Sequence, residues 1–153
     1  MPADKSALDA SNRTSYRYFS RITTRWIDND IYGHINNVTY YQFFDTISNE
    51  YLIRECGLDI HHAENVGFIV ASSCQYLKPI SHPALIDAGF RVNRLGKSSV
   101  EYGVGIFVEG ESAASAFGTF THVFVNRNTG KSVPIPTAIR QGLEKVLVEG
   151  GFE

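Results

Sequence analysis

The sequence predicts an α+β fold in which an antiparallel sheet of about five strands wraps around one long central helix. One long amphipathic segment stands near the N-terminus, and apolar segments of strand length follow it with turn residues between them. The chain has 153 residues, of which 43% are hydrophobic and 20% charged. This size and composition suit a single globular domain that needs no metal or disulfide to be stable.

The first segments predict a tail and a strand. Residues 1–17 are polar and mixed, so we expect a loose N-terminal tail there and one domain over residues 18–150. Residues 18–27 are rich in aromatic and β-branched side chains and predict the first strand. Turn-forming residues dominate the next stretch, up to His34.

Residues 38–56 predict the long helix. Either Asn36 or Asn37 suits its N-cap, because an asparagine side chain can accept a free backbone N–H, and Gly57 suits its end. The apolar residues that recur at helical spacing on one face are Tyr40, Phe44, Ile47 and Tyr51.

The second half of the chain predicts four strands and a short helix. The strands are expected at residues 67–77, 84–95, 100–108 and 113–125. The second and third of these alternate apolar and other residues, which is typical of half-buried strands. The last is apolar on both sides, so it is either central or faces a partner as well as the core. A final helix is expected with Thr137 as its N-cap.

Charge and composition exclude several classes of function. The net charge of −2 offers no basic surface for nucleic acid. No apolar run is long enough to span a membrane, and the N-terminus lacks the apolar core of a signal peptide. The chain has only two cysteines, Cys56 and Cys74, so we expect a cytoplasmic protein without a disulfide framework.

The stretch before the long helix carries the residues that are suited to chemistry. Asp28, Asp30 and His34 come just ahead of the helix start, together with the asparagines. A helix N-terminus offers free N–H groups and a partial positive charge, which can stabilise a carboxylate or a developing oxyanion. The alternative is that both aspartates are turn and capping residues.

Residues 30–40 read Asp-Ile-Tyr-Gly-His-Ile-Asn-Asn-Val-Thr-Tyr and resemble the Asp-x-x-Gly-His-x-Asn-Asn-x-x-Tyr signature of the hotdog-fold acyl-CoA thioesterases, relatives of 4-hydroxybenzoyl-CoA thioesterase. Shorter matches follow at residues 57–58, 76–79, 94–99 and 129–131, so the resemblance runs from about residue 22 to residue 147. It implies the hotdog fold, in which the sheet wraps the helix in the element order given above.

The resemblance also implies roles for single residues. Asp30 would be the catalytic carboxylate, either as general base on a water or as nucleophile on the thioester carbonyl. His34 and Asn36 would line or orient the site, and backbone N–H groups at the helix N-terminus would polarise the carbonyl. His34 departs from the 4-hydroxybenzoyl enzymes, so the resemblance favours the broader acyl-CoA branch.

A second group of residues suits the phosphates of coenzyme A. A predicted hairpin carries three cationic residues and two hydroxyl residues, namely Arg91, Arg94, Lys97, Ser98 and Ser99. Their side chains could bind the phosphate groups. The alternative is a solvated turn. In the family the corresponding turn contributes to the coenzyme A site, often against a neighbouring subunit, so we expect a homodimer or homotetramer.

Other chemistries find less support. His61 and His62 lack a third ligand at suitable spacing, so we expect no metal, and we expect no cofactor. The chain has no Gly-x-Ser-x-Gly motif of an α/β-hydrolase. Two alternative functions stay open, namely a non-catalytic module that binds acyl-CoA or acyl carriers, and a hotdog hydratase or dehydratase of acyl thioesters.

Overall fold

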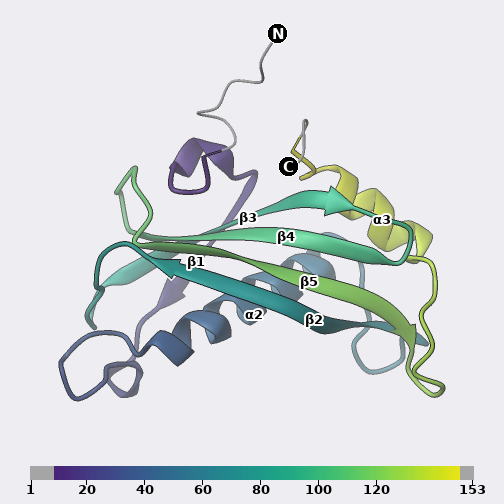
Figure 1. Cartoon of the computed structure of the whole chain (residues 1–153), viewed down its shortest axis with the longest axis horizontal. Helices are drawn as coiled ribbons and strands as arrows, with labels where there is room; N and C mark the ends of the chain where they lie inside the picture. The colour runs from purple at the N-terminus through teal and green to yellow at the C-terminus, as the bar shows by residue number, and fades with distance from the viewer. Residues whose placement is uncertain (1–8, 149–153) are drawn as a thin grey trace, which may run out of the picture.

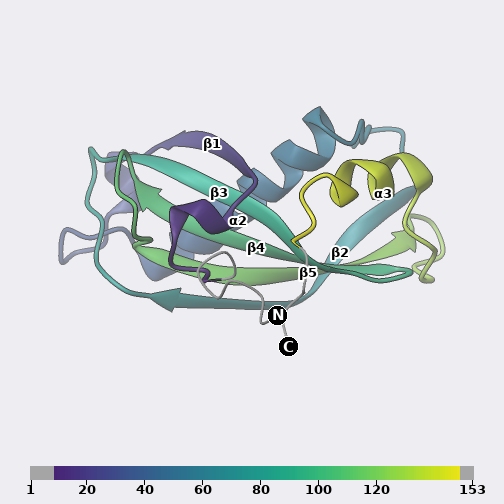
Figure 2. The ribbon, with the colours of Figure 1, turned by 90° about the horizontal axis from the view of Figure 1, so that it is seen from above.

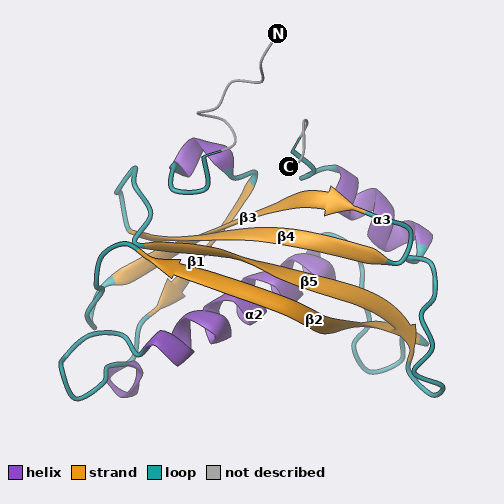
Figure 3. Ribbon diagram, in the orientation of Figure 1, coloured by secondary structure: helices purple, strands orange, loops and turns teal. Residues whose placement is uncertain are grey.

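The computed structural model describes residues 9–148, and its elements follow the predicted order (Figures 1 and 3). The strands are β1 (Tyr18–Thr23), β2 (Asn65–Tyr76), β3 (Leu85–Leu95), β4 (Ser99–Val108) and β5 (Ala116–Asn126). The α-helices are α2 (Asn37–Arg54) and α3 (Thr137–Glu144), and the 3₁₀ helices are η1 (Arg13–Ser15) and η2 (Trp26–Asp28). Among residues 9–148, no helix is both long and apolar enough to cross a membrane.

The five strands form one antiparallel sheet in the order β1-β3-β4-β5-β2. The long helix α2 lies across one face of this sheet, and η1 lies on the opposite side (Figures 1 and 2). This confirms the predicted fold of a sheet around one central helix. β5 lies between β4 and β2, so the last predicted strand is central, which is one of the two predicted alternatives.

The core lies between α2 and the sheet. The predicted face of the helix is buried, and Phe44 and Ile47 have no exposed surface. Every second residue of β3, from Ile86 to Val92, belongs to the same apolar cluster. Removing one such large side chain from water contributes about 1.5–3 kcal/mol, so this contact fixes where α2, and thus its N-terminus, sits on the sheet.

Several predicted boundaries were wrong, and the last strand begins at Ala116 rather than at residue 113. β1 ends at Thr23 rather than at residue 27, because the Asp28 carboxylate accepts the Arg25 N–H at 2.8 Å and folds the next residues into η2. Thr137 is the first residue of α3 rather than its cap, and Pro136 takes the cap position. Gly57 follows α2 with a φ of +72°, a conformation that favours glycine.

The predicted loose tail is also corrected for residues 9–17, whereas residues 1–8 lie outside the described residues. Tyr16 is buried, and its hydroxyl donates to the Ala10 carbonyl at 2.6 Å. Its ring packs over Gly89 and Gly105, where an added Cβ would lie within 2.8 Å and 2.6 Å of ring atoms. Residues 9–17 therefore cover part of the face opposite α2, over β3 and β4.

Candidate active site

The aspartate motif forms a closed loop just before α2. The Asp30 N–H donates to the His34 carbonyl at 2.7 Å, and the Gly33 N–H donates to the Asp30 carbonyl at 3.1 Å. Gly33 has a φ of +83°, which a residue with a Cβ rarely adopts. The Ile35 N–H then donates to the Ile80 carbonyl at 2.7 Å, so the loop is fastened to the chain that follows β2.

The Asp30 carboxylate is held in place by this loop. Its Oδ1 accepts the Tyr32 N–H at 2.8 Å and the His34 N–H at 3.3 Å. Its Oδ2 accepts no hydrogen bond from residues 9–148. One oxygen is therefore anchored by amides while the other is available to a substrate or a water.

The two aspartates of the motif differ in their surroundings. Asp28 is buried, and its Oδ1 lies 2.9 Å from Nη2 of Arg25. Its backbone carbonyl accepts the Asn36 N–H at 2.8 Å, just before α2 begins. Asp28 thus matches the structural alternative for these residues, whereas Asp30 borders a cleft.

Asn36 is the N-cap of α2. Its side-chain oxygen accepts the Val38 N–H at 3.1 Å, which satisfies one of the free amides of the first turn. The side chain is therefore engaged with the helix rather than lining the cleft. The neighbouring Asn37 N–H donates to no acceptor in the described part of the chain, and Asn37 lines the cleft.

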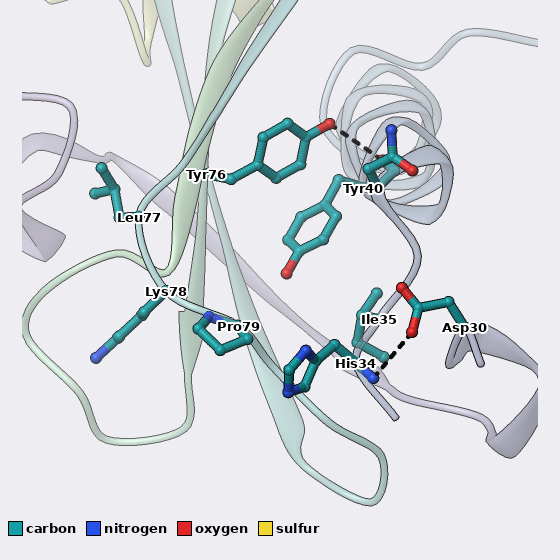
Figure 4. Close-up of a pocket in the computed structure, with 9 residues that line it drawn as sticks. Asp30, His34, Ile35, Tyr40, Tyr76, Leu77, Lys78 and Pro79 are labelled. Carbon is teal, nitrogen blue, oxygen red and sulfur yellow. Dashed lines mark hydrogen bonds between the residues drawn. The ribbon is translucent and has the colours of Figure 1, made fainter. Parts of the chain in front are cut away.

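A cleft of about 330 Å³ lies between this loop, the start of α2 and the end of β2. Asp30 and His34 line it on one side, residues 76–79 line it on the other, and Tyr40 forms its inner wall (Figure 4). The Tyr76 hydroxyl donates to the Asn37 carbonyl at 3.2 Å, and the rings of Tyr76 and Tyr40 meet edge to face at 5.2 Å.

The residues assigned to coenzyme A do not lie at this cleft. Arg94, Lys97, Ser98 and Ser99 surround the β3–β4 turn, at the opposite end of the sheet from the start of α2 (Figure 1). Lys97 is exposed, and its carbonyl accepts the Ile135 N–H at 2.9 Å, close to α3. One chain alone cannot bring this turn and Asp30 together.

The predicted role of Arg91 in binding coenzyme A is also corrected. It is fully buried rather than part of the hairpin, because residues 9–17 cover it. Its Nε donates to the Asn93 side chain at 2.8 Å, and its guanidinium lies 5.1 Å from the centre of the Tyr16 ring. Burial lowers the pKa of Arg91. This arginine holds the N-terminal segment on the sheet and is not available to a phosphate at the turn.

The structure adds residues that the sequence did not single out as site residues. Tyr76, Lys78 and Pro79 reach the cleft although they are far from Asp30 along the chain. Lys78 Nζ also lies 2.6 Å from a carboxylate oxygen of Glu111. The match of residues 76–79 to the family was the sequence signal that could have placed them here.

A sheet wrapped around one long helix is the hotdog fold, and the Asp30 loop lies just before the start of that helix. A family model described as the Thioesterase superfamily matches residues 32–115, which is more than half of the chain. The chain belongs to the Thioesterase superfamily, and it is a thioester hydrolase with the hotdog fold.

Similar proteins cover nearly the whole chain. The crystal structure of the PA5185 protein from Pseudomonas aeruginosa strain PAO1 is 50% identical, has a TM-score of 0.89, and covers 91% of this chain and 97% of that chain. The PA2801 protein from Pseudomonas aeruginosa is 29% identical with a TM-score of 0.77, over 81% of this chain and 95% of that chain. The long-chain acyl-CoA thioesterase FadM of Escherichia coli strain K12 is 25% identical over 130 residues, which are 84% of this chain and 98% of FadM.

Proposed function

We propose that this protein is an acyl-CoA thioesterase that hydrolyses an acyl-CoA to a free carboxylic acid and coenzyme A. The observation that carries the proposal is that the unpaired Oδ2 of Asp30 and the unpaired N–H of Asn37 belong to residues of one cleft. A base and an oxyanion donor suffice for a thioester, because the thiolate is a good leaving group. The similarity to FadM supports a coenzyme A thioester as the substrate.

In the proposed reaction Asp30 acts as general base. Its Oδ2 takes a proton from a water whose oxygen bonds to the thioester carbonyl carbon. The carbonyl oxygen gains negative charge and is stabilised by the Asn37 N–H and the partial positive charge at the start of α2. The carbon–sulfur bond then breaks, and the thiolate receives the proton from Asp30. In the alternative, Oδ2 attacks the carbonyl itself and water hydrolyses the resulting anhydride.

We further propose that a second copy of the chain completes the substrate site, in a homodimer or homotetramer. β2 is an edge strand of the sheet, and Phe68 and Val70 on it are 53% and 59% exposed. An apolar edge strand with free backbone groups favours pairing with another strand. If two β2 strands pair antiparallel, the β3–β4 turn of one copy can approach the cleft of the other. Arg94 and Lys97 would then bind the phosphates of coenzyme A.

The acyl preference is proposed on the resemblance, with His34 favouring the broad acyl-CoA branch over aryl substrates. The cytoplasmic location stays a prediction from the low cysteine content.

The test measures thiol release from a panel of acyl-CoA and aryl-CoA esters with the wild type, Asp30→Asn and Asp45→Asn. Asp45 is exposed on α2, outside the residues that line the cleft, so its variant controls for loss of charge. We expect Asp30→Asn alone to abolish turnover. Equal rates in all three proteins would remove Asp30 from the mechanism.

The same panel separates the alternative functions. Tight binding of acyl-CoA in calorimetry without any hydrolysis would favour a non-catalytic binding module. Loss of the conjugated double bond of an enoyl-CoA would favour a hydratase.

A further inference from the structure

Tyr40 is a buried residue whose hydroxyl group has no hydrogen-bond partner among residues 9–148. Its side chain is only 3% exposed, yet the hydroxyl makes no hydrogen bond to any residue from 9 to 148. The other buried tyrosines are all satisfied, since the hydroxyls of Tyr16, Tyr51 and Tyr102 bond to Ala10, Gly142 and His122. Tyr40 is therefore the exception among the buried tyrosines that the structure describes.

The hydroxyl of Tyr40 points into the cleft, toward the side where His34 and Pro79 lie (Figure 4). A phenylalanine would fill the same space at the inner wall, so the hydroxyl is not needed to fill it. The ring packs against Phe43 at 6.0 Å and Tyr76 at 5.2 Å, so packing needs the ring but not the oxygen. The oxygen is suited to a ligand in the cleft.

Tyr40 lies about one turn after Asn37 on α2, and both residues line the cleft. Side chains on a helix lean toward its N-terminus, so residue 40 covers the turn that contains Asn37. Tyr76 fixes this arrangement, because its hydroxyl bonds to the Asn37 carbonyl while its ring supports Tyr40. Burial raises the pKa of Tyr40 to about 12, so near neutral pH the hydroxyl keeps its proton and can donate it in a hydrogen bond.

We propose that Tyr40 is a catalytic residue whose hydroxyl donates a hydrogen bond to the carbonyl oxygen of the thioester, together with the Asn37 N–H. This inference rests on the proposed thioesterase reaction. As water adds to the carbonyl carbon, the oxygen becomes an oxyanion, and the Tyr40 hydroxyl stabilises it without giving up its proton. When the carbon–sulfur bond breaks, the carbonyl re-forms and the proton on Asp30 passes to the thiolate.

The test is Tyr40→Phe, which removes the oxygen and keeps the ring. We expect kcat to fall about 10²-fold with KM nearly unchanged, because the hydrogen bond strengthens only as charge develops. The fall should be the same from about pH 6 to about pH 9, since the hydroxyl stays protonated over this range. The midpoint of urea unfolding should stay nearly unchanged, because the variant keeps the ring and removes a hydroxyl that makes no hydrogen bond to residues 9–148.

Tyr41→Phe is the matched control. Tyr41 is the next residue on α2, its ring stacks on Phe120 at 5.9 Å, and it does not line the cleft. Removal of its hydroxyl should leave kcat unchanged. A Tyr40→Phe enzyme with wild-type kcat would overturn the inference and leave the proposed function intact, and so would a rise in KM alone. A wild type that hydrolyses no thioester would overturn both.

Discussion

His122 makes the stability of this fold sensitive to acid. It stands on β5 between Phe120 and Phe124, on the face that meets α2, and it is only 3% exposed. Its Nδ1 lies 2.9 Å from the Tyr102 hydroxyl. Burial lowers the pKa of His122 from 6.5 to about 4, because a charged imidazole would lose its hydration there.

The direction and size of the effect follow from this shift. Between about pH 6.5 and about pH 4 the unfolded chain binds a proton at His122 and the folded chain does not, so the free energy of unfolding falls as the pH falls. The loss is about 2 kcal/mol at about pH 5 and approaches about 3 kcal/mol below about pH 4. Above about pH 7 this histidine contributes no pH dependence.

The assay is urea unfolding, followed by circular dichroism at one protein concentration, at about pH 7.5 and about pH 5. The wild type and His122→Gln are compared, with His61→Gln as the control because His61 is exposed. We expect His122→Gln to lose about 2 kcal/mol less between the two pH values than the wild type does. If all three proteins lose the same amount, His122 is not the group that titrates.

Three further perturbations test the site and the assembly. Gly33→Ala places a Cβ at a φ of +83°, so it should cost about 1–2 kcal/mol in urea unfolding and lower kcat by displacing Asp30, and unchanged values of both would contradict this role. The double variant Arg94→Ala/Lys97→Ala should raise KM for an acyl-CoA but not for the corresponding acyl-pantetheine, and an equal rise for both would argue against phosphate contacts. The wild type should elute well above 17.0 kDa in gel filtration, and Val70→Lys should shift it toward the monomer, whereas a wild-type elution of this variant would argue against pairing through β2.

The fold could be predicted because its signals are local. Helical spacing around Phe44 and Ile47 and the alternation along β3 and β4 each report on a few neighbouring residues. The end of β1 could not be predicted, because it depends on the carboxylate of Asp28 folding back onto Arg25, which no periodicity reports.

In the candidate site, too, local contacts could be predicted from the sequence and long-range contacts could not. The contacts of Asp30 all lie within residues 30–34, so the short motif contains every residue that holds this side chain. The contribution of Tyr76 depends on bringing the end of β2 to the start of α2, which is a long-range contact. The prediction that Arg91 binds a phosphate was wrong, because strand alternation shows which residues face away from the helix but not which segment covers them. Glycines at 89 and 105 were the available signal of a close approach on that side.

The N-terminal segment limits how copies of this chain can be arranged. Residues 9–17 occupy the side of the sheet away from α2, with Tyr16 seated over Gly89 and Gly105. The sheets of two copies could pack face to face over this region only if the segment first detached from the sheet. Detachment would break the contacts of Tyr16 and Arg91. We therefore expect the interfaces of an oligomer to form at the β2 edge of the sheet or on the side that carries α2. Deletion of residues 1–17 should expose the surface that Tyr16 covers and should promote association between copies of the chain.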